Sequence, residues 1–294
     1  MNTIDTIDAN GIRICYESFG NPAGPPLLLI MGLAAQMVVW DDDFCMLLAS
    51  KGYRVIRFDN RDVGEATRLD GAPAPTMTEI FSAPYTGKPL PASYTLQDLA
   101  RDTTGLMDAL GIQSAHVVGL SMGGMIAQEL AINFPDRVRT LTSIMSSTGD
   151  PSLPQATPPA LAVLARDIPR ERSGYVENYV SAWRVLNGDQ LPFDAERTAF
   201  TAGRSFDRGI NPPGVSRQML AIIASGNRTA KLANVELPAL VIHGTNDPLV
   251  PVEAGHATAR AIPGAKLELV EGMGHTLPRP AWPQIVNAIA EHAR

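Results

Sequence analysis

The sequence has few cysteines and no long apolar run. Its two cysteines, Cys15 and Cys45, are too few among 294 residues for a disulfide framework or a cysteine-rich zinc site. Both lie in apolar segments, where a thiol usually packs as a small buried hydrophobe. No apolar stretch approaches the ~18 residues that span a bilayer, and the opening residues MNTIDTIDANG show no signal-peptide pattern. We therefore expect a cytoplasmic protein without a membrane partner.

Basic residues are scarce relative to acidic ones. The chain has 24 Lys and Arg against 30 Asp and Glu, a formal charge of −6, and no Lys/Arg run. This balance argues against nucleic acid or an anionic membrane as a partner. Hydrophobic residues reach 45% and charged residues 18%, which argues against disorder and is enough for a large core. The length is typical of one α/β domain that carries an insertion.

The usual signatures of metal and nucleotide sites are also missing. The chain contains no H-E-x-x-H, no paired cysteine motif and no P-loop. No G-x-G-x-x-G follows the first continuously apolar run, so nucleotide binding has little support. We expect no metal and no cofactor.

The apolar pattern predicts strands that alternate with helices. Residues 3–9 and 12–19 alternate in polarity, and Asn10-Gly11 between them predicts a hairpin turn. Short continuous apolar runs, typical of strands buried on both faces, follow at Leu27–Met31, Tyr53–Phe58, Ala115–Gly119, Thr140–Met145, Ala239–His243 and Lys266–Val270. Helical spacing separates most of these runs. The fold class is therefore α/β, with a mostly parallel, doubly wound sheet.

One long segment, residues 146–234, breaks this alternation. It opens with the proline-rich DPSLPQATPP and has no clear strand run. Helical candidates within it are Ala160–Asp167, Gly174–Leu186, Asp194–Phe206 and Val215–Ser225. A crossover of this length is far longer than an ordinary connection. We therefore predict a helical cap over residues 146–234, inserted into a core domain formed by residues 1–145 and 235–294.

A candidate nucleophile lies in Gly119-Leu120-Ser121-Met122-Gly123, a G-x-S-x-G match. A predicted strand leads into the motif and a predicted helix leaves it, the context of a nucleophile elbow. The flanking glycines leave room for neighbouring backbone at so sharp a turn. The helix N-terminus behind Ser121 offers free N–H groups and a positive dipole end, which favour developing negative charge.

A serine hydroxyl needs a base, and the base needs a carboxylate. His275 follows the last predicted strand in a glycine-rich loop and is the candidate base; His243, at the end of a strand, is its rival. The order serine, acid, histidine is met by Asp247, which follows a predicted strand. Asp150 also meets it, but it opens the proline-rich linker, where aspartate is an ordinary turn residue. We predict the triad Ser121, Asp247 and His275.

The oxyanion of acyl transfer needs two backbone donors. One should be the N–H of Met122, the residue after the nucleophile, and the other should come from the loop after the first parallel strand. In that loop Leu33 is the first candidate and Gly32 the second.

The substrate pocket should be largely apolar, with few polar groups. We predict substrate contacts from Gly32, from Trp40 and Met145 near strand ends, and from Trp183 in the cap. Further apolar cap residues, some of which should face the pocket, are Tyr175, Tyr179, Phe206, Met219 and Ile223. Arg184 and Arg204 are candidates to hold one substrate carboxylate.

The chain resembles the α/β-hydrolases with a helical cap and, among them, the bacterial serine esterases related to aclacinomycin methylesterase. The matching stretches are LLLIMG, VIRFDNRDVG, AHVVGLSMGG, WRVLNG, VIHGTNDPLVP and EGMGH. The resemblance implies the triad and the two main-chain donors named above. Met31-Gly32 stands where many relatives have His-Gly, a change that leaves the backbone donors intact. Asp59 and Arg61 match a loop motif near the site, and we interpret them as a structural ion pair or turn.

Together these features predict a serine carboxylesterase that acts through an acyl-enzyme. Its expected substrates are small to medium hydrophobic esters, including methyl esters of bulkier acids. Lactone opening, C–C bond hydrolysis, thioesterase action and cofactor-free perhydrolysis use the same triad and remain alternatives. A catalytically silent small-ligand receptor is the alternative from another class, and the intact Ser, Asp and His argue against it. The expected partner is the ester itself, and the expected assembly is a monomer or homodimer.

Overall fold

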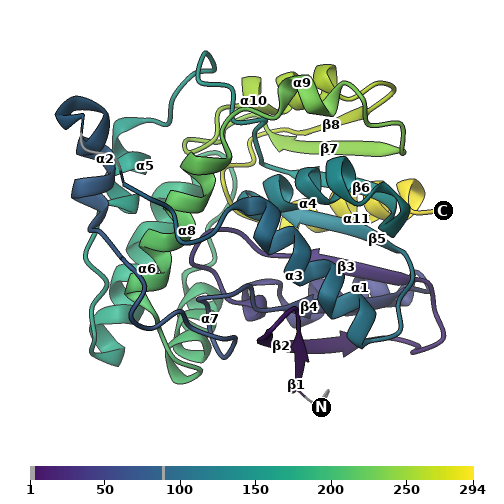
Figure 1. Cartoon of the computed structure of the whole chain (residues 1–294), viewed down its shortest axis with the longest axis horizontal. Coiled ribbons are helices and arrows are strands. Elements are labelled where there is room, and N and C mark those ends of the chain that lie inside the picture. Colours follow the sequence, from purple (N-terminus) through teal and green to yellow (C-terminus); the bar gives the residue numbers. More distant parts are fainter. Residues whose placement is uncertain (1–3, 88–89) are drawn as a thin grey trace.

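The computed structural model describes residues 4–87 and 90–294, and within them eight strands form one sheet (Figure 1). The strands are β1 Ile4–Ala9, β2 Ile12–Phe19, β3 Pro26–Ile30, β4 Arg54–Phe58, β5 Ala115–Leu120, β6 Val138–Ile144, β7 Ala239–Gly244 and β8 Lys266–Val270. Each overlaps a predicted strand. The first prediction also included Thr3, which lies outside the described residues.

The strand order is β1-β2-β4-β3-β5-β6-β7-β8. The last six strands in this order, β4-β3-β5-β6-β7-β8, pair in parallel. Strands β1 and β2 add an antiparallel edge. Asn10 and Gly11 join β1 to β2 with φ values of 50° and 74°, the positive pair that a two-residue hairpin turn needs. The predicted fold class, a mostly parallel doubly wound α/β sheet, is confirmed.

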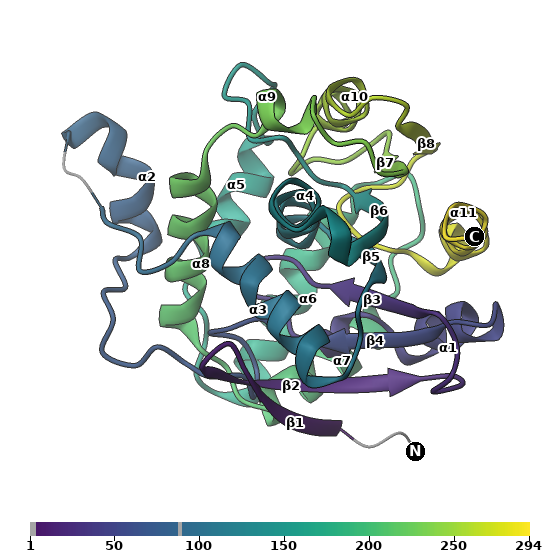
Figure 2. The same ribbon diagram turned by 45° about the vertical axis from the view of Figure 1, so that its right-hand side comes forward.

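Helices cover both faces of the sheet (Figure 2). One face carries α3 (Leu96–Ala109) and α4 (Met122–Asn133), and the other carries α1 (Asp42–Ser50) and α11 (Trp282–His292). Helix α10 (Val252–Ala261) contacts β7 and β8. Short 3-10 turns are η1 Met37–Val39, η2 Pro135–Arg137 and η3 Arg279–Ala281.

The segment between β6 and β7 is helical. It contains α5 Pro158–Leu164, α6 Arg172–Asn187, α7 Ala195–Asp207, α8 Pro212–Ser225 and the short α9 Thr229–Leu232. The first four overlap the predicted helices, whereas α9 was not predicted. Helix α2 (Met77–Thr86) was also not predicted, and its Ile80 packs on Met219 and Leu220 of α8. A helix from outside residues 146–234 therefore packs against this helical segment.

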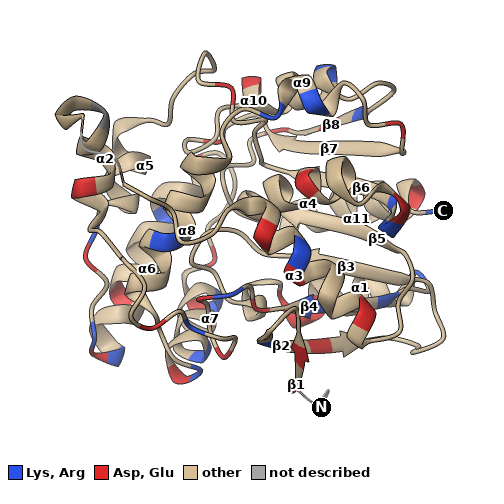
Figure 3. Cartoon of the chain, viewed as in Figure 1, with Lys and Arg blue, Asp and Glu red and all other residues tan. Residues whose placement is uncertain are grey.

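Charged residues of both signs are intermingled along the chain (Figure 3). Among the described residues, no helix combines the length and apolar character needed to cross a membrane.

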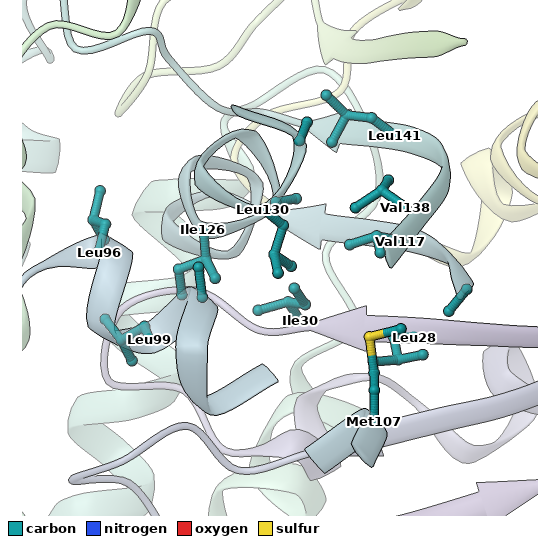
Figure 4. Packing of buried hydrophobic residues seen from close by; sticks show 14 of the residues in the cluster. Leu28, Ile30, Leu96, Leu99, Met107, Val117, Ile126, Leu130, Val138 and Leu141 are labelled. Carbon is teal, nitrogen blue, oxygen red and sulfur yellow. The ribbon is translucent and has the colours of Figure 1, made fainter. Parts of the chain in front are cut away.

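The core beneath the β5–α4 junction packs against both faces of the sheet. Alternate residues of β3 point to opposite faces: Leu28 and Ile30 pack with α3 and α4 (Figure 4), while Leu27 and Leu29 pack with α1 and α11. These β3 side chains are fully buried. Strand β5, which pairs with β3, is buried in the same way: Val117 packs on the first side, and Val118 and Leu120 pack on the second, just before Ser121.

Candidate active site

Ser121 lies in the sharp turn between β5 and α4. Its backbone has φ 56° and ψ −120°, a conformation that residues with a side chain rarely adopt. The turn is held by the Ser121 N–H, which donates to the Ile144 carbonyl at 2.9 Å. It also needs glycine on both sides: a Cβ on Gly119 would lie 2.1 Å from the Gly123 carbonyl oxygen, and one on Gly123 would lie 2.1 Å from the Ile30 oxygen. Close backbone approach therefore accounts for the flanking glycines of the motif.

His275 reaches Ser121 from the loop after β8. Its Nε2 lies 3.0 Å from Ser121 Oγ and its Nδ1 lies 2.7 Å from Asp247 Oδ2. The His275 N–H donates to the Leu186 carbonyl at 2.7 Å, which ties the loop to α6. The structure thus joins the three residues predicted as a triad in one chain of hydrogen bonds.

Asp247 is oriented by the loop that follows β7. Its Oδ1 accepts hydrogen bonds from the N–H groups of Leu249 and Val250 at 2.9 and 2.8 Å, which leaves Oδ2 for His275. The Asp247 side chain is fully buried. Asp150, the rival acid, instead lies in a turn where its carboxylate accepts from Ser152.

His243, the rival base, contacts the acid rather than the serine. Its Nε2 lies 2.8 Å from the Val250 carbonyl oxygen and 3.7 Å from Asp247 Oδ2. Burial lowers the pKa of His243, which favours a neutral ring that donates to Val250. It is a packed neighbour of the acid loop.

The two predicted oxyanion donors belong to segments that adjoin Ser121. Met122 begins α4, and the loop after β3 approaches so closely that a Cβ on Gly32 would lie 3.1 Å from Ser121 Cβ. Within the described part of the chain, the N–H groups of Leu33 and Met122 have no hydrogen-bond acceptor. Both are therefore available to a developing oxyanion.

A cavity of about 420 Å³ begins beside this site. Its lining includes Met31, Leu120 and His275, next to Ser121, and continues along α6, α7 and η3. The aromatic wall consists of Tyr179, Trp183, Phe193 and Trp282. Apolar surface predominates in the cavity, as predicted, but the polar lining residues are more numerous than expected: Asp41, Asn187, Asp194, Arg197, Thr198, Thr201, Thr276 and Arg279.

Among the predicted substrate contacts, Trp183 lines the cavity and Gly32 lies against Ser121. The structure places Trp40 and Met145 elsewhere, in the core with no exposed surface. Trp40 stacks on Phe44 at a centroid distance of 5.7 Å, so its ring fills the layer under α1. A position near a strand end does not determine whether a side chain turns toward the pocket or the core.

Of the other side chains predicted to face the pocket, one lines the cavity and the rest lie elsewhere. Tyr179 lines the cavity, and Tyr175 stacks behind it at 5.8 Å with Phe206 beyond at 5.5 Å. Met219 packs against α2, and Ile223 is 54% exposed.

The arginines that line the cavity differ from the two that we expected there. Arg184 lies over the Phe193 ring, and Arg204 pairs with Asp42. The lining arginines are Arg197 of α7, paired with Asp41 at 2.5 Å, and Arg279 of η3, paired with Asp43 at 2.7 Å. For the contact between α7 and the aspartates a signal was present in the sequence: three consecutive aspartates, 41–43, and the arginines 197 and 204, seven positions apart on one predicted helix.

Asp59 and Arg61 form ion pairs, but not with each other. Asp59 pairs with Arg208 at 2.6 Å and Arg61 pairs with Asp102 at 2.5 Å. These contacts fit the predicted structural role, and Arg61 lies in a turn. Of the two predicted forms, the ion pair between Asp59 and Arg61 is absent, because Asp59 points to Arg208 after α7 and Arg61 points to Asp102 of α3.

The two cysteines are free thiols. Cys15 and Cys45 are unpaired and buried, and burial raises the pKa of both thiols to about 12. In the described residues, no group of three or more His, Cys, Asp or Glu side chains is arranged to hold a metal ion.

Two family models match the chain. The model described as alpha/beta hydrolase fold matches residues 25–182, and one described as TAP-like protein matches residues 223–291. The first covers the elbow and the second covers the loops that carry Asp247 and His275.

Similar proteins span almost the whole chain. Rhodomycin D methylesterase DauP of Streptomyces sp. (strain C5) is 31% identical, over 98% of this chain and 97% of its own length. Among solved structures, the meta-cleavage product hydrolase CumD of Pseudomonas fluorescens IP01 matches with a TM-score of 0.77 and 22% identity, over 98% of this chain and 96% of that one. The enol-lactonase of Burkholderia xenovorans LB400 matches with a TM-score of 0.72 and 22% identity, over 98% of this chain and 99% of that one. These structural matches concern the fold.

Proposed function

This chain belongs to the alpha/beta hydrolase fold family, and from that premise we propose that it is a serine carboxylesterase. The observation that carries the proposal is the hydrogen-bonded chain Asp247–His275–Ser121 at a strained elbow, with a cavity beside it. This arrangement supports nucleophilic acyl transfer.

In the proposed first step, Ser121 Oγ attacks the ester carbonyl carbon. The Ser121 proton passes to His275 Nε2 across the 3.0 Å hydrogen bond. Asp247 accepts from Nδ1–H, selects the tautomer with a free Nε2, and stabilises the imidazolium that forms. The carbonyl oxygen becomes negative and accepts hydrogen bonds from the N–H groups of Leu33 and Met122.

In the proposed second step, the tetrahedral intermediate collapses and the ester C–O bond breaks. His275 returns its proton to the departing alcohol, and the acyl group remains on Ser121. Water then attacks the acyl carbon while His275 accepts a proton from it. Release of the acid returns the proton to Ser121, so the enzyme ends as it began.

The cavity supports hydrophobic esters as the substrate class. Its aromatic wall, Tyr179, Trp183, Phe193 and Trp282, offers apolar surface for a ring or chain. Since a similar protein is named a rhodomycin D methylesterase, we include methyl esters of bulkier acids among the proposed substrates. We propose a cytoplasmic location as well, which the two free cysteines support.

The test combines turnover with active-site labelling. The purified protein should hydrolyse p-nitrophenyl butyrate and be labelled at one equivalent by a fluorophosphonate. Ser121→Ala should abolish both, apart from residual catalysis by the oxyanion donors. Ser152→Ala, in an exposed turn, is the matched control and should retain full activity. Labelling of Ser121→Ala at one equivalent would show that another residue is the nucleophile.

A substrate panel then tests the ester assignment. We expect kcat/KM for carboxylic esters to exceed that for lactones, thioesters and C–C substrates. A higher value for one of those classes assigns the same triad to that reaction. Labelling without turnover of any substrate supports the receptor alternative.

A further inference from the structure

Gln218 of α8 connects the inserted helices to the loop that carries Leu33. Its side chain is fully buried, and both ends of its amide are used. Oε1 accepts from the Ala34 N–H at 2.9 Å, and Nε2 donates to the Arg61 carbonyl at 3.0 Å. Figures 1 and 2 show α8 beyond the end of the sheet toward which β3 runs. A side chain of the insertion thus binds the main chain of the loop beside the nucleophile.

The loop needs such a contact because its turn is strained. The Ala35 N–H donates to the Gly32 carbonyl at 3.3 Å, which closes a turn over Leu33 and Ala34. Ala34, at the third position of this turn, has φ 62°. Positive φ is disfavoured for a residue with a Cβ, and glycine is preferred at this position in turns of this kind. The hydrogen bond that the Ala34 N–H donates to Gln218 holds the Leu33–Ala34 peptide in an orientation that alanine does not favour by itself.

The ends of the loop have separate anchors. Asn60 Nδ2 donates to the Met31 carbonyl at 3.0 Å, and the Met37 N–H donates to Asp59 at 2.8 Å. In the middle of the loop, next to Leu33, the Ala34 N–H donates a hydrogen bond to Gln218.

The position of Gln218 is itself fixed by its neighbour. Arg217 pairs with the buried carboxylate of Asp62 through two hydrogen bonds, at 2.8 and 2.7 Å. Helix α8 is therefore held to the 60–62 loop at the residue before Gln218.

We propose that Gln218 is a positioning residue for the oxyanion site: by fixing the Ala34 peptide it holds the Leu33 N–H toward the reacting carbonyl. This inference rests on the proposed esterase function. Loss of a direct oxyanion donor lowers kcat by roughly 10²–10³. Loosening one donor through its turn should cost less, about 10-fold to 100-fold in kcat, with KM nearly unchanged because the donor acts mainly on the transition state.

The experiment compares variants that remove or keep the acceptor. Gln218→Leu and Gln218→Met remove both hydrogen bonds at similar volume, whereas Gln218→Glu keeps an acceptor for the Ala34 N–H. We expect the first two to lose kcat on p-nitrophenyl butyrate and to bind a trifluoromethyl ketone more weakly by a similar factor. Gln218→Glu should retain most of kcat. Met219→Leu, the next residue of α8 and packed on α2, is the control for helix packing and should leave both values unchanged.

A rescue variant separates positioning from general damage. Ala34→Gly added to Gln218→Leu should restore part of kcat, because glycine adopts positive φ without penalty. Circular dichroism and thermal melting identify any variant that fails to fold, in which case Gln218→Met replaces Gln218→Leu.

Three outcomes would overturn the inference: an unchanged kcat in the folded Leu or Met variant, a loss confined to KM, or no rescue by glycine. If the wild-type protein turns over no ester and takes no fluorophosphonate label, the proposed function fails. If the wild type is active and the Gln218 variants match it, the positioning role alone fails.

Discussion

Asp247 illustrates how much of the candidate site depends on single hydrogen bonds. Two backbone N–H groups bind Oδ1, and His275 binds Oδ2. The carboxylate is fully buried, so its charge is compensated by fixed donors rather than by water. A group held in this way can orient an imidazole without moving.

Asp247→Asn should keep the fold and lower kcat by up to ~10⁴, because the amide no longer accepts from Nδ1–H and the tautomer is lost. Asp150→Asn is the matched control, since that carboxylate is bonded to Ser152 in its own turn. Steady-state kinetics with p-nitrophenyl butyrate measures both. A large loss in Asp150→Asn, with Asp247→Asn near wild type, would move the acid to the end of β6.

At the scale of elements, the helices between β6 and β7 are attached to the rest of the chain in two ways. Helix α7 is attached by two partly exposed ion pairs: Arg197 to Asp41, which line the cavity, and Arg204 to Asp42, which do not. Helix α8 is attached by the pair Arg217 to Asp62, at 2% and 0% side-chain exposure. Exposed pairs contribute little and are screened by salt, whereas breaking a buried pair leaves a charge without compensation.

Arg217→Met should therefore destabilise the protein by about 3–5 kcal/mol, since Asp62 stays buried and loses its cation. Urea unfolding followed by circular dichroism measures the free energy of unfolding. Arg172→Met is the matched control: Arg172 pairs with Asp207 on the surface, and its loss should change stability little. Equal effects of the two substitutions would show that α8 is not anchored by this pair.

At the scale of the whole molecule, stability should depend on pH through a histidine remote from the site. His116 lies at the start of β5, bonded to Thr140 Oγ1 at 3.0 Å. Burial lowers the pKa of His116 from 6.5 to about 4. Between these values the unfolded chain binds a proton that the folded protein does not, so the free energy of unfolding falls as pH decreases from about 6.5 to about 4.

His116→Gln should flatten this part of the stability–pH curve, measured by urea unfolding at several pH values. His256→Gln, on the half-buried face of α10, is the control and should keep the wild-type slope. An unchanged slope in His116→Gln would assign the acid sensitivity to other groups.

The cavity determines which esters the whole molecule admits. With about 420 Å³ of space, we expect kcat/KM in a p-nitrophenyl ester series to peak at short or medium acyl chains. Trp183→Ala should move the peak to longer chains, because removing the indole ring from the wall enlarges the cavity. Tyr85→Ala, at a position 92% exposed, should leave the peak in place. A wild-type peak at long chains, with a jump in rate on triglyceride emulsions, would contradict this prediction.

The fold class and the elbow were determined by the sequence itself, because both depend on local periodicity. Continuous apolar runs specify strands that are buried on both faces, and glycines at 119 and 123 mark where backbone segments must nearly touch. The chain order serine, acid, histidine then left few candidates for the acid and the base, and Asp247 and His275 were selected from them. Such signals are carried by neighbouring residues, so one sequence suffices to read them.

Only the tertiary structure decided which side chains contact each other when they lie far apart in the sequence. Trp40 turned into the core rather than the cavity, Arg197 and Arg279 replaced Arg184 and Arg204 at the site, and Asp59 and Arg61 found different partners. Gln218 bonds a residue 184 positions away. No local pattern encodes these contacts, because a side chain's partner is set by how helices and loops pack once the sheet has formed.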